Sequence, residues 1–171
     1  HMPAHIYYRV GRFGDSIRAN QAAAKADEAY FSRANPSAMY QYGYYTHNLH
    51  FILTSAQASG DARTAMAAAA KLDAQLPMEM TKNVPMAQPV KAAPWFAKAQ
   101  FASPASILAE PAPADGVDYV KASWLFARAI AHVRSGDPEA ARAESAKLAA
   151  LSSTGDFAAM EAGGIPVKDL I

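Results

Sequence analysis

Three segments of the chain are built alike around a glycine: Tyr8-Arg9-Val10-Gly11-Arg12-Phe13, Gln57-Ala58-Ser59-Gly60-Asp61-Ala62 and Val133-Arg134-Ser135-Gly136-Asp137-Pro138. An amphipathic stretch precedes each glycine, and an alanine-rich stretch follows it. This pattern is typical of a helix-turn-helix unit that repeats along a solenoid. The segments therefore predict an all-α protein whose function depends on the residues that line the groove of the array.

The composition excludes several classes of partner. The chain has 171 residues, of which 18% are charged, and a formal net charge of +1 at pH 7. A chain this close to neutral has no electrostatic footprint for nucleic acid or for an anionic membrane surface. Its apolar runs are short, such as Ala65 to Ala70, and far below the roughly 20 residues that span a bilayer. We therefore expect neither nucleic-acid binding nor membrane insertion.

Cysteine is absent, which excludes disulfides and thiolate metal sites. A chain without cysteine is compatible with both the cytoplasm and the periplasm, so the sequence does not identify the compartment. The chain begins at His1, inside a predicted helix, and shows no targeting pattern. We therefore expect a fragment of a longer bacterial protein. His1-Met2 as a cloning remnant is the alternative.

Capping residues and periodicity predict helices at about 3–10, 15–31, 38–58, 61–76, 86–101, 105–109, 117–134 and 137–151. Pro89 and Pro94 are expected to interrupt the fifth of these helices. Residues 77–85 are predicted to form an irregular connection, 110–116 a loop, and 152–171 a loosely packed C-terminal tail.

Two further stretches carry a family resemblance: His1-Met2-Pro3-Ala4-His5-Ile6-Tyr7 and Tyr45-Thr46-His47-Asn48-Leu49-His50-Phe51. They resemble the HMPxHIY and YxHNxHF stretches that a group of bacterial tetratricopeptide-repeat proteins carries in consecutive repeats. The resemblance covers most of the chain, and it departs at Thr46, where proline is expected, and at Ala102-Ser103, where that repeat usually has glycine and an aromatic residue. It confers no established biochemical activity.

The resemblance implies a superhelical array of about 7–8 helices arranged as antiparallel hairpins. The repeat domain would cover residues 1–151, with repeats at about 1–34, 38–76, 86–110 and 117–151. In such repeats the first helix of each pair lines the concave groove. Aligning the turn glycines with the repeat consensus then places His1, His5 and Tyr8 of the first repeat, and His47 and His50 of the second, on that groove.

The spacing of these histidines suggests a metal site. His1 and His5 lie four residues apart, and His47 and His50 lie three apart, so each pair occupies one face of a helix. Imidazoles from neighbouring helices can hold Zn²⁺, Cu²⁺ or Ni²⁺. The alternative is structural, because buried histidines also hydrogen-bond backbone carbonyls or tyrosine hydroxyls.

Tyr40, Tyr44 and Asn48 follow one another along one side of a predicted helix, next to His47. Together with Tyr8 they form a candidate ligand-binding wall, because tyrosine combines a rigid ring with a polar tip. The alternative is that this stripe packs against the preceding helix. Asn20 is expected to be a polar core residue that satisfies the backbone.

The sequence lacks a phosphate-binding loop, a nucleophile elbow and a His-Glu-x-x-His motif, so it favours a non-catalytic role. The predicted function is an interaction module that binds a peptide, a protein partner or a small ligand in its concave groove. A histidine-rich metal-binding or metal-dependent protein is the alternative. Self-association is also expected if missing upstream helices normally cover apolar surface.

Overall fold

In the computed structural model, which describes residues 1–113 and 117–167, the predicted turn glycines close their helices. Gly11, Gly60 and Gly136 adopt φ angles of 75°, 74° and 75°. This left-handed conformation is easy for glycine and costly for residues that carry a Cβ. Asp61 and Asp137 then cap the helices that follow, each accepting a hydrogen bond from a backbone N–H three residues on.

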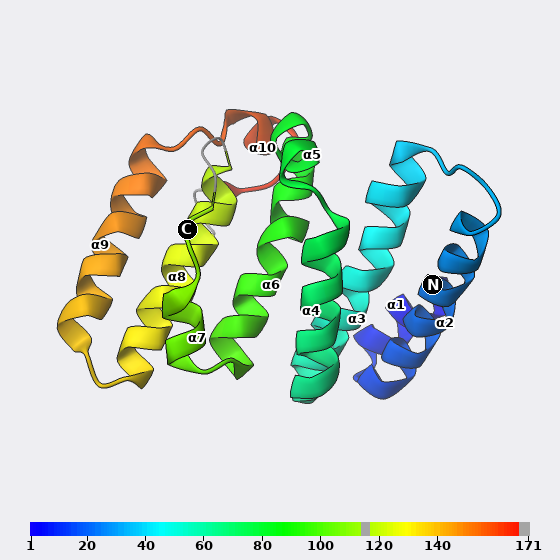
Figure 1. Cartoon of the computed structure of the whole chain (residues 1–171), viewed down its shortest axis with the longest axis horizontal. Coiled ribbons are helices and arrows are strands. Elements are labelled where there is room, and N and C mark those ends of the chain that lie inside the picture. The colour runs from blue at the N-terminus through cyan, green and yellow to red at the C-terminus, as the bar shows by residue number, and fades with distance from the viewer. Residues whose placement is uncertain (114–116, 168–171) are drawn as a thin grey trace. The chain divides into compact units, whose positions relative to one another are not determined.

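The chain divides into two compact units, His1–Pro77 and Met78–Ile171. The first unit contains the helices α1 (Met2–Arg9), α2 (Phe13–Phe31), α3 (Tyr45–Ser59) and α4 (Ala62–Gln75), with a π-helical turn at Tyr40–Tyr44 before α3 (Figure 1). Each helix packs on the next. The core includes Leu49, Leu53 and Leu72, which are almost completely buried.

The second unit contains α5 (Met78–Asn83), a 3-10 turn (Pro85–Ala87), α6 (Gln88–Phe101), α7 (Pro104–Ala109), α8 (Asp118–Arg134), α9 (Pro138–Thr154) and α10 (Ala158–Ala162). Helix α8 packs on α6, α7 and α9. Ile107, Val117 and Val120 are at most 1% exposed and belong to a shared apolar core.

The all-helical prediction is confirmed, but the helix count is not. The described residues form ten α-helices, where about 7–8 were expected. One additional helix is α5, which occupies the predicted irregular connection 77–85 and buries Thr81 completely. Six residues between two prolines are too few to show helical periodicity, so only packing reveals this helix.

The predicted loose tail is wrong in its first part. Helix α9 continues to Thr154, and α10 follows. Phe157, Met160 and Val167 are 5%, 1% and 0% exposed and belong to the core of the second unit. Apolar residues in a short, glycine-containing segment carry little signal until their neighbours are known.

Helix α6 runs without a break from Gln88 to Phe101, so the interruption expected at Pro89 and Pro94 does not occur. Pro89 lies in the first turn, where the missing N–H has no helical partner in any case. Pro94 removes one internal hydrogen bond, but it is buried beside Trp95 and Ala97, and this packing holds the helix together. The predicted loop 110–116 is non-helical from 110 to 113, and its remainder lies outside the described residues.

Helix α1 presents a stripe of exposed apolar side chains. Met2, Ile6 and Val10 are 70%, 67% and 63% exposed and follow one another at intervals of about one turn. Among the described residues, no helix combines the length and the apolar character that crossing a membrane requires.

We expect Gly60→Ala to lower the free energy of unfolding by about 1–2 kcal/mol, because its φ of 74° forces a Cβ into the left-handed region. Gly14→Ala is the matched control. It lies in α2 at an ordinary φ, and only the flexible end of Arg18 comes near, 3.6 Å from the added Cβ. This control should raise the free energy of unfolding by up to about 1 kcal/mol. Urea titrations would contradict the turn assignment if both variants shifted in the same direction.

We expect Met160→Ala to destabilise the protein by about 2–5 kcal/mol, because its side chain is 1% exposed and truncation leaves a cavity. Ser153→Ala, at an exposed position of α9, should stay within about 0.5 kcal/mol of the wild type. Thermal and urea unfolding measure both changes. Equal stability of the two variants would mean that the C-terminal segment is not packed.

Candidate histidine-lined binding site

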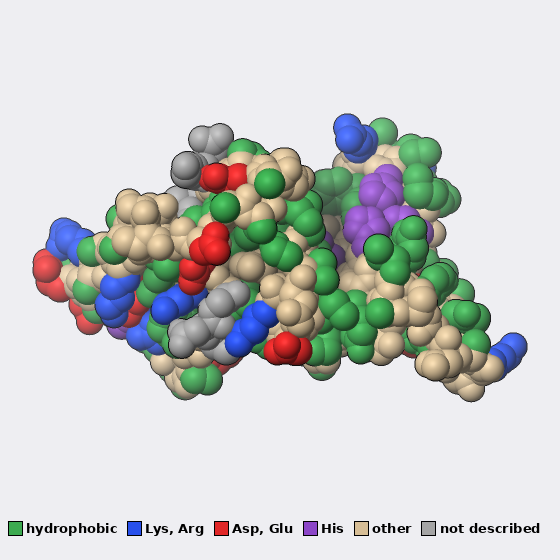
Figure 2. Space-filling model, turned by 90° about the horizontal axis from the view of Figure 1, so that it is seen from above, with side chains coloured by type: hydrophobic (Ala, Val, Ile, Leu, Met, Phe, Trp, Pro, Cys, Tyr) green, Lys and Arg blue, Asp and Glu red, His purple; other side chains and the backbone are tan. Residues whose placement is uncertain are grey.

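A cavity of about 630 Å³ opens in the first unit between α1, α2, the π-helical turn and α3. His1 is the N-cap residue of α1 and His5 lies within that helix, whereas His47 and Asn48 come from α3. Figure 2 shows histidine side chains gathered in one place on the surface, surrounded by hydrophobic groups. The volume lies within the range of small-molecule sites.

Three imidazoles converge in this cavity. One ring nitrogen each of His1, His5 and His47 lies within 4.8 Å of the others. The two Nε2 atoms of His1 and His5 are 2.7 Å apart, and the rings of His1 and His47 have centroids 4.7 Å apart. Three of the four histidines that were predicted to share a groove therefore meet, and His50 is the exception.

Asn20 fixes which nitrogen of the His1 ring carries the proton. Its Nδ2 donates to the Ser16 carbonyl at 3.3 Å, which leaves Oδ1 to face the His1 Nδ1 at 2.8 Å. An amide oxygen only accepts, so the Nδ1 of His1 carries the proton. In the neutral ring the Nε2 of His1 then carries a lone pair, and the Nε2 of His5 donates a hydrogen bond to that lone pair. Asn20 is fully buried, as expected, and it also orients the His1 ring.

Burial keeps the α3 histidines neutral. Burial is the main cause that lowers the pKa of His47, and nearby His5 adds to the effect. Burial also lowers the pKa of His50 to about 4, with a smaller contribution from His47. His50 does not join the group of converging imidazoles, so the structure assembles three of the four predicted ligands.

A buried carboxylate organises the opposite wall of the cavity. Asp27 of α2 is 7% exposed and accepts hydrogen bonds from the Tyr40 hydroxyl at 2.9 Å and from the Asn48 Nδ2 at 2.7 Å. The hydrogen bond to Asp27 and its charge raise the pKa of the Tyr40 hydroxyl. Tyr40 and Asn48 therefore pack on α2, as the packing alternative expects, and they also line the cavity, while ligand binding by this stripe stays a prediction.

The π-helical turn sets the direction of the tyrosines. It spans Tyr40 to Tyr44, and the hydroxyl of Thr46 donates to the carbonyls of Tyr42 and Gly43 at its end. Wide turns of this kind are rare and recur at functional sites. Tyr44 lines the cavity and remains 63% exposed.

Tyr8 lies in a different hollow from the other predicted ligand-binding residues. It lines a neighbouring space with His5 and Phe51, and its ring centroid is 5.5 Å from that of Phe51. Phe51 also contacts the rings of His1, His5 and His47, with centroid distances of 5.8, 4.3 and 5.8 Å. The Phe51 ring therefore contacts all three imidazoles.

Asp27 and Phe51 are the two residues that sequence reasoning did not select. Phe51 follows His47 by one helical turn, so helical spacing could have placed it beside the imidazole. Asp27 had no such signal, because a carboxylate near a helix end is ordinarily solvated. Its role depends on donors that the fold brings from another helix.

Comparison of the chain with known protein families, with curated proteins and with solved structures returns no match.

We expect the free energy of unfolding of His50→Gln to fall less than that of the wild type as the pH is lowered below 7. The pKa of His50 is about 4 in the folded state against 6.5 ordinarily, so the unfolded chain takes up the proton first as the pH falls below 6.5. Stability that is present above pH 6.5 is therefore lost toward pH 4. Between pH 7 and pH 4.5 the wild type should lose about 2 kcal/mol more than the variant. Urea unfolding at the two pH values measures this difference, and equal losses would contradict the burial of a neutral imidazole.

Proposed function

We propose that this chain is a tetratricopeptide-like helical-repeat module whose first unit binds a transition metal ion through His1, His5 and His47. The repeat assignment is supported by the glycine-closed turns, by the packing of each helix of the first unit on the next, and by the family resemblance of the histidine stretches. The observation that carries the metal proposal is the convergence of three imidazole nitrogens within 4.8 Å.

The donor set suits Zn²⁺, Cu²⁺ or Ni²⁺. Nitrogen ligands at 2.0–2.1 Å around a tetrahedral ion lie roughly 3.3–3.4 Å from one another. The nitrogens of His1 and His5, at 2.7 Å, would part slightly, and the nitrogen of His47, which lies within 4.8 Å of both, would complete the set with small side-chain movements. The His5 proton that bridges this pair moves to the Nδ1 of His5, so both Nε2 lone pairs become ligands without a change in ring charge.

Asn20 supplies the outer support that such sites need. Metal-binding histidines ordinarily donate their second ring N–H to an oxygen, which fixes the tautomer and the ring orientation. The His1 Nδ1 makes this contact with the buried Asn20 Oδ1 at 2.8 Å. The ring is therefore held in a binding orientation before a metal arrives.

Three protein ligands leave a coordination position open, and the cavity lies in front of it. A peptide side chain or small ligand with a nitrogen, oxygen or sulfur donor would complete the shell while Tyr44 and Tyr40 contact its body. The described cavity residues offer histidine, tyrosine, asparagine and a carboxylate whose oxygens are already engaged. This arrangement supports recognition rather than catalysis.

The second candidate is recognition of a peptide or small ligand by the same cavity without a metal. It is favoured by Asp27, which holds Tyr40 and Asn48 in place beforehand and so lowers the ordering cost of binding. The exposed ring of Tyr44 would then be the main contact.

Calorimetric titration with Zn²⁺, Cu²⁺ and Ni²⁺ tests the metal proposal. We expect one ion per chain, and at least tenfold weaker binding in His5→Gln and in His47→Gln, because each removes one ligand. Asn20→Ala removes the hydrogen-bond partner of the His1 ring and no ligand, and it should weaken binding by about tenfold. His132→Gln, in α8 of the second unit, is the matched control and should leave the affinity unchanged.

A protein extended by several residues before His1 controls for metal binding by a free terminal amine. If that protein binds no ion, or if the triad variants bind as the wild type does, the metal proposal fails. Metal-free recognition in the cavity then becomes the function to pursue.

A further inference from the structure

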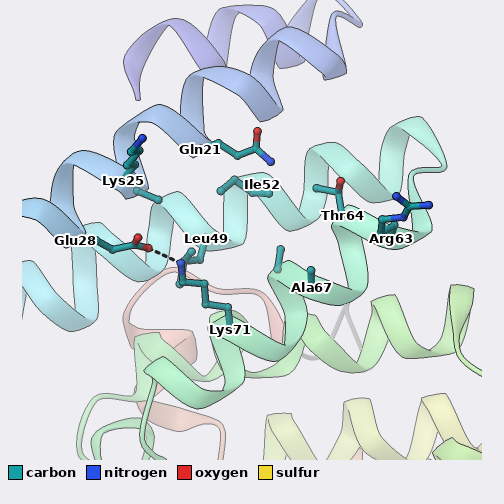
Figure 3. A pocket seen from close by; sticks show the side chains of 11 residues that line it. Gln21, Lys25, Glu28, Leu49, Ile52, Arg63, Thr64, Ala67 and Lys71 are labelled. Carbon is teal, nitrogen blue, oxygen red and sulfur yellow. Dashed lines mark hydrogen bonds and ion pairs between the residues drawn. The ribbon is translucent and has the colours of Figure 1, made fainter.

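A second hollow, of about 550 Å³, lies between α2 and α4 and shares no lining residue with the histidine cavity. Figure 3 shows Lys25 and Glu28 coming from α2, Arg63 and Lys71 from α4, and Ile52 from α3 between them. The hollow is therefore a groove with two helical walls and a third helix as its floor.

The floor and walls of this groove are apolar and close to the backbone. Leu49 and Ile52 of α3 form the floor. Ala24 of α2 and Ala67 and Ala68 of α4 line the walls. Small side chains on both walls allow another helix to approach closely, as in helix-in-groove recognition.

The rim of the groove is cationic. Lys25, Arg63 and Lys71 are exposed, and they come from both walls. Among the described residues that line the groove, Glu28 is the one carboxylate, and it is already paired with Lys71 and accepts a hydrogen bond from the Tyr45 hydroxyl at 2.7 Å. Asp61 at the start of α4 lies close enough to Arg63 to offset part of its charge. The three cations of the rim still outnumber the two nearby carboxylates, Glu28 and Asp61, so the rim keeps a net positive charge.

The length of the groove suits a short helix. The α2 wall runs from Gln21 to Glu28 and the α4 wall from Arg63 to Lys71, which at 1.5 Å per residue is about 10–12 Å, or about two helical turns. A partner of this length would place about three apolar side chains on the floor. Acidic side chains on its flanks would face Lys25 and Arg63.

We propose that this groove docks an acidic amphipathic helix of a partner protein. The apolar stripe of that helix contacts Leu49 and Ile52, and its carboxylates pair with Lys25 on one wall and Arg63 on the other. The proposal is independent of the metal site, because the two hollows use different residues of α2 and α3.

The probe is a fluorescent, end-capped peptide of about four turns, with leucines at helical spacing and glutamates on both flanks. A matched peptide carries lysine in place of every glutamate. We expect the wild-type protein to bind the acidic peptide at least tenfold more tightly by fluorescence anisotropy, with an affinity that falls as salt rises. In the double variant Lys25→Glu and Arg63→Glu the preference should reverse in favour of the basic peptide.

Both substituted side chains are exposed, so circular dichroism and unfolding should match the wild type. Lys147→Glu, on α9 of the second unit, carries the same type of charge reversal as a control and should leave the preference unchanged. His5→Gln should also bind the acidic peptide as the wild type does, which separates this surface from the metal site. Absence of binding, equal binding of the two peptides, or a preference that survives the double reversal would overturn the proposal.

Discussion

Two buried polar contacts fix how α2 lies against α3, and both candidate sites depend on this register. Near one end of the interface the hydroxyls of Ser16 and Ser55 are 2.8 Å apart, and near the other the Asp27 carboxylate accepts from Asn48 at 2.7 Å. A slip of one helix along the other would leave these groups buried without partners, at a cost of about 1–3 kcal/mol each. These contacts thereby lock α2 and α3 in one antiparallel register.

That register divides the side chains of α2 and α3 between two surfaces. Asp27 faces the histidine cavity with His47 and Asn48, whereas Lys25 faces the basic groove with Leu49 and Ile52. The unit therefore presents a neutral, aromatic hollow and a cationic, apolar groove from the same two helices. The separation follows from helical periodicity, because neighbours in sequence point about 100° apart.

Strong local signals predict the long elements of this protein well. The left-handed glycines and capping aspartates locate the hairpins because those residues act within one turn of the chain. The same reasoning missed α5 and α10, and it expected a break at Pro94 that buried packing overrides. Four histidines were predicted to converge and three do, since His50, three residues after His47 in α3, is not among the converging rings.

By itself, the sequence determined the helical class, the main turns and the presence of histidines on the facing sides of two helices, since each of these follows from local backbone preference and helical periodicity. Only the tertiary structure decided which polar groups meet. Asp27 organises the cavity wall because Tyr40 and Asn48 donate hydrogen bonds to it. The tautomer of His1 depends on its contact with Asn20. The net charge of the groove depends on the pairing of Glu28 with Lys71. These contacts join residues far apart in the chain, and periodicity carries no information about the distance between two helices or the rotation of one against the other.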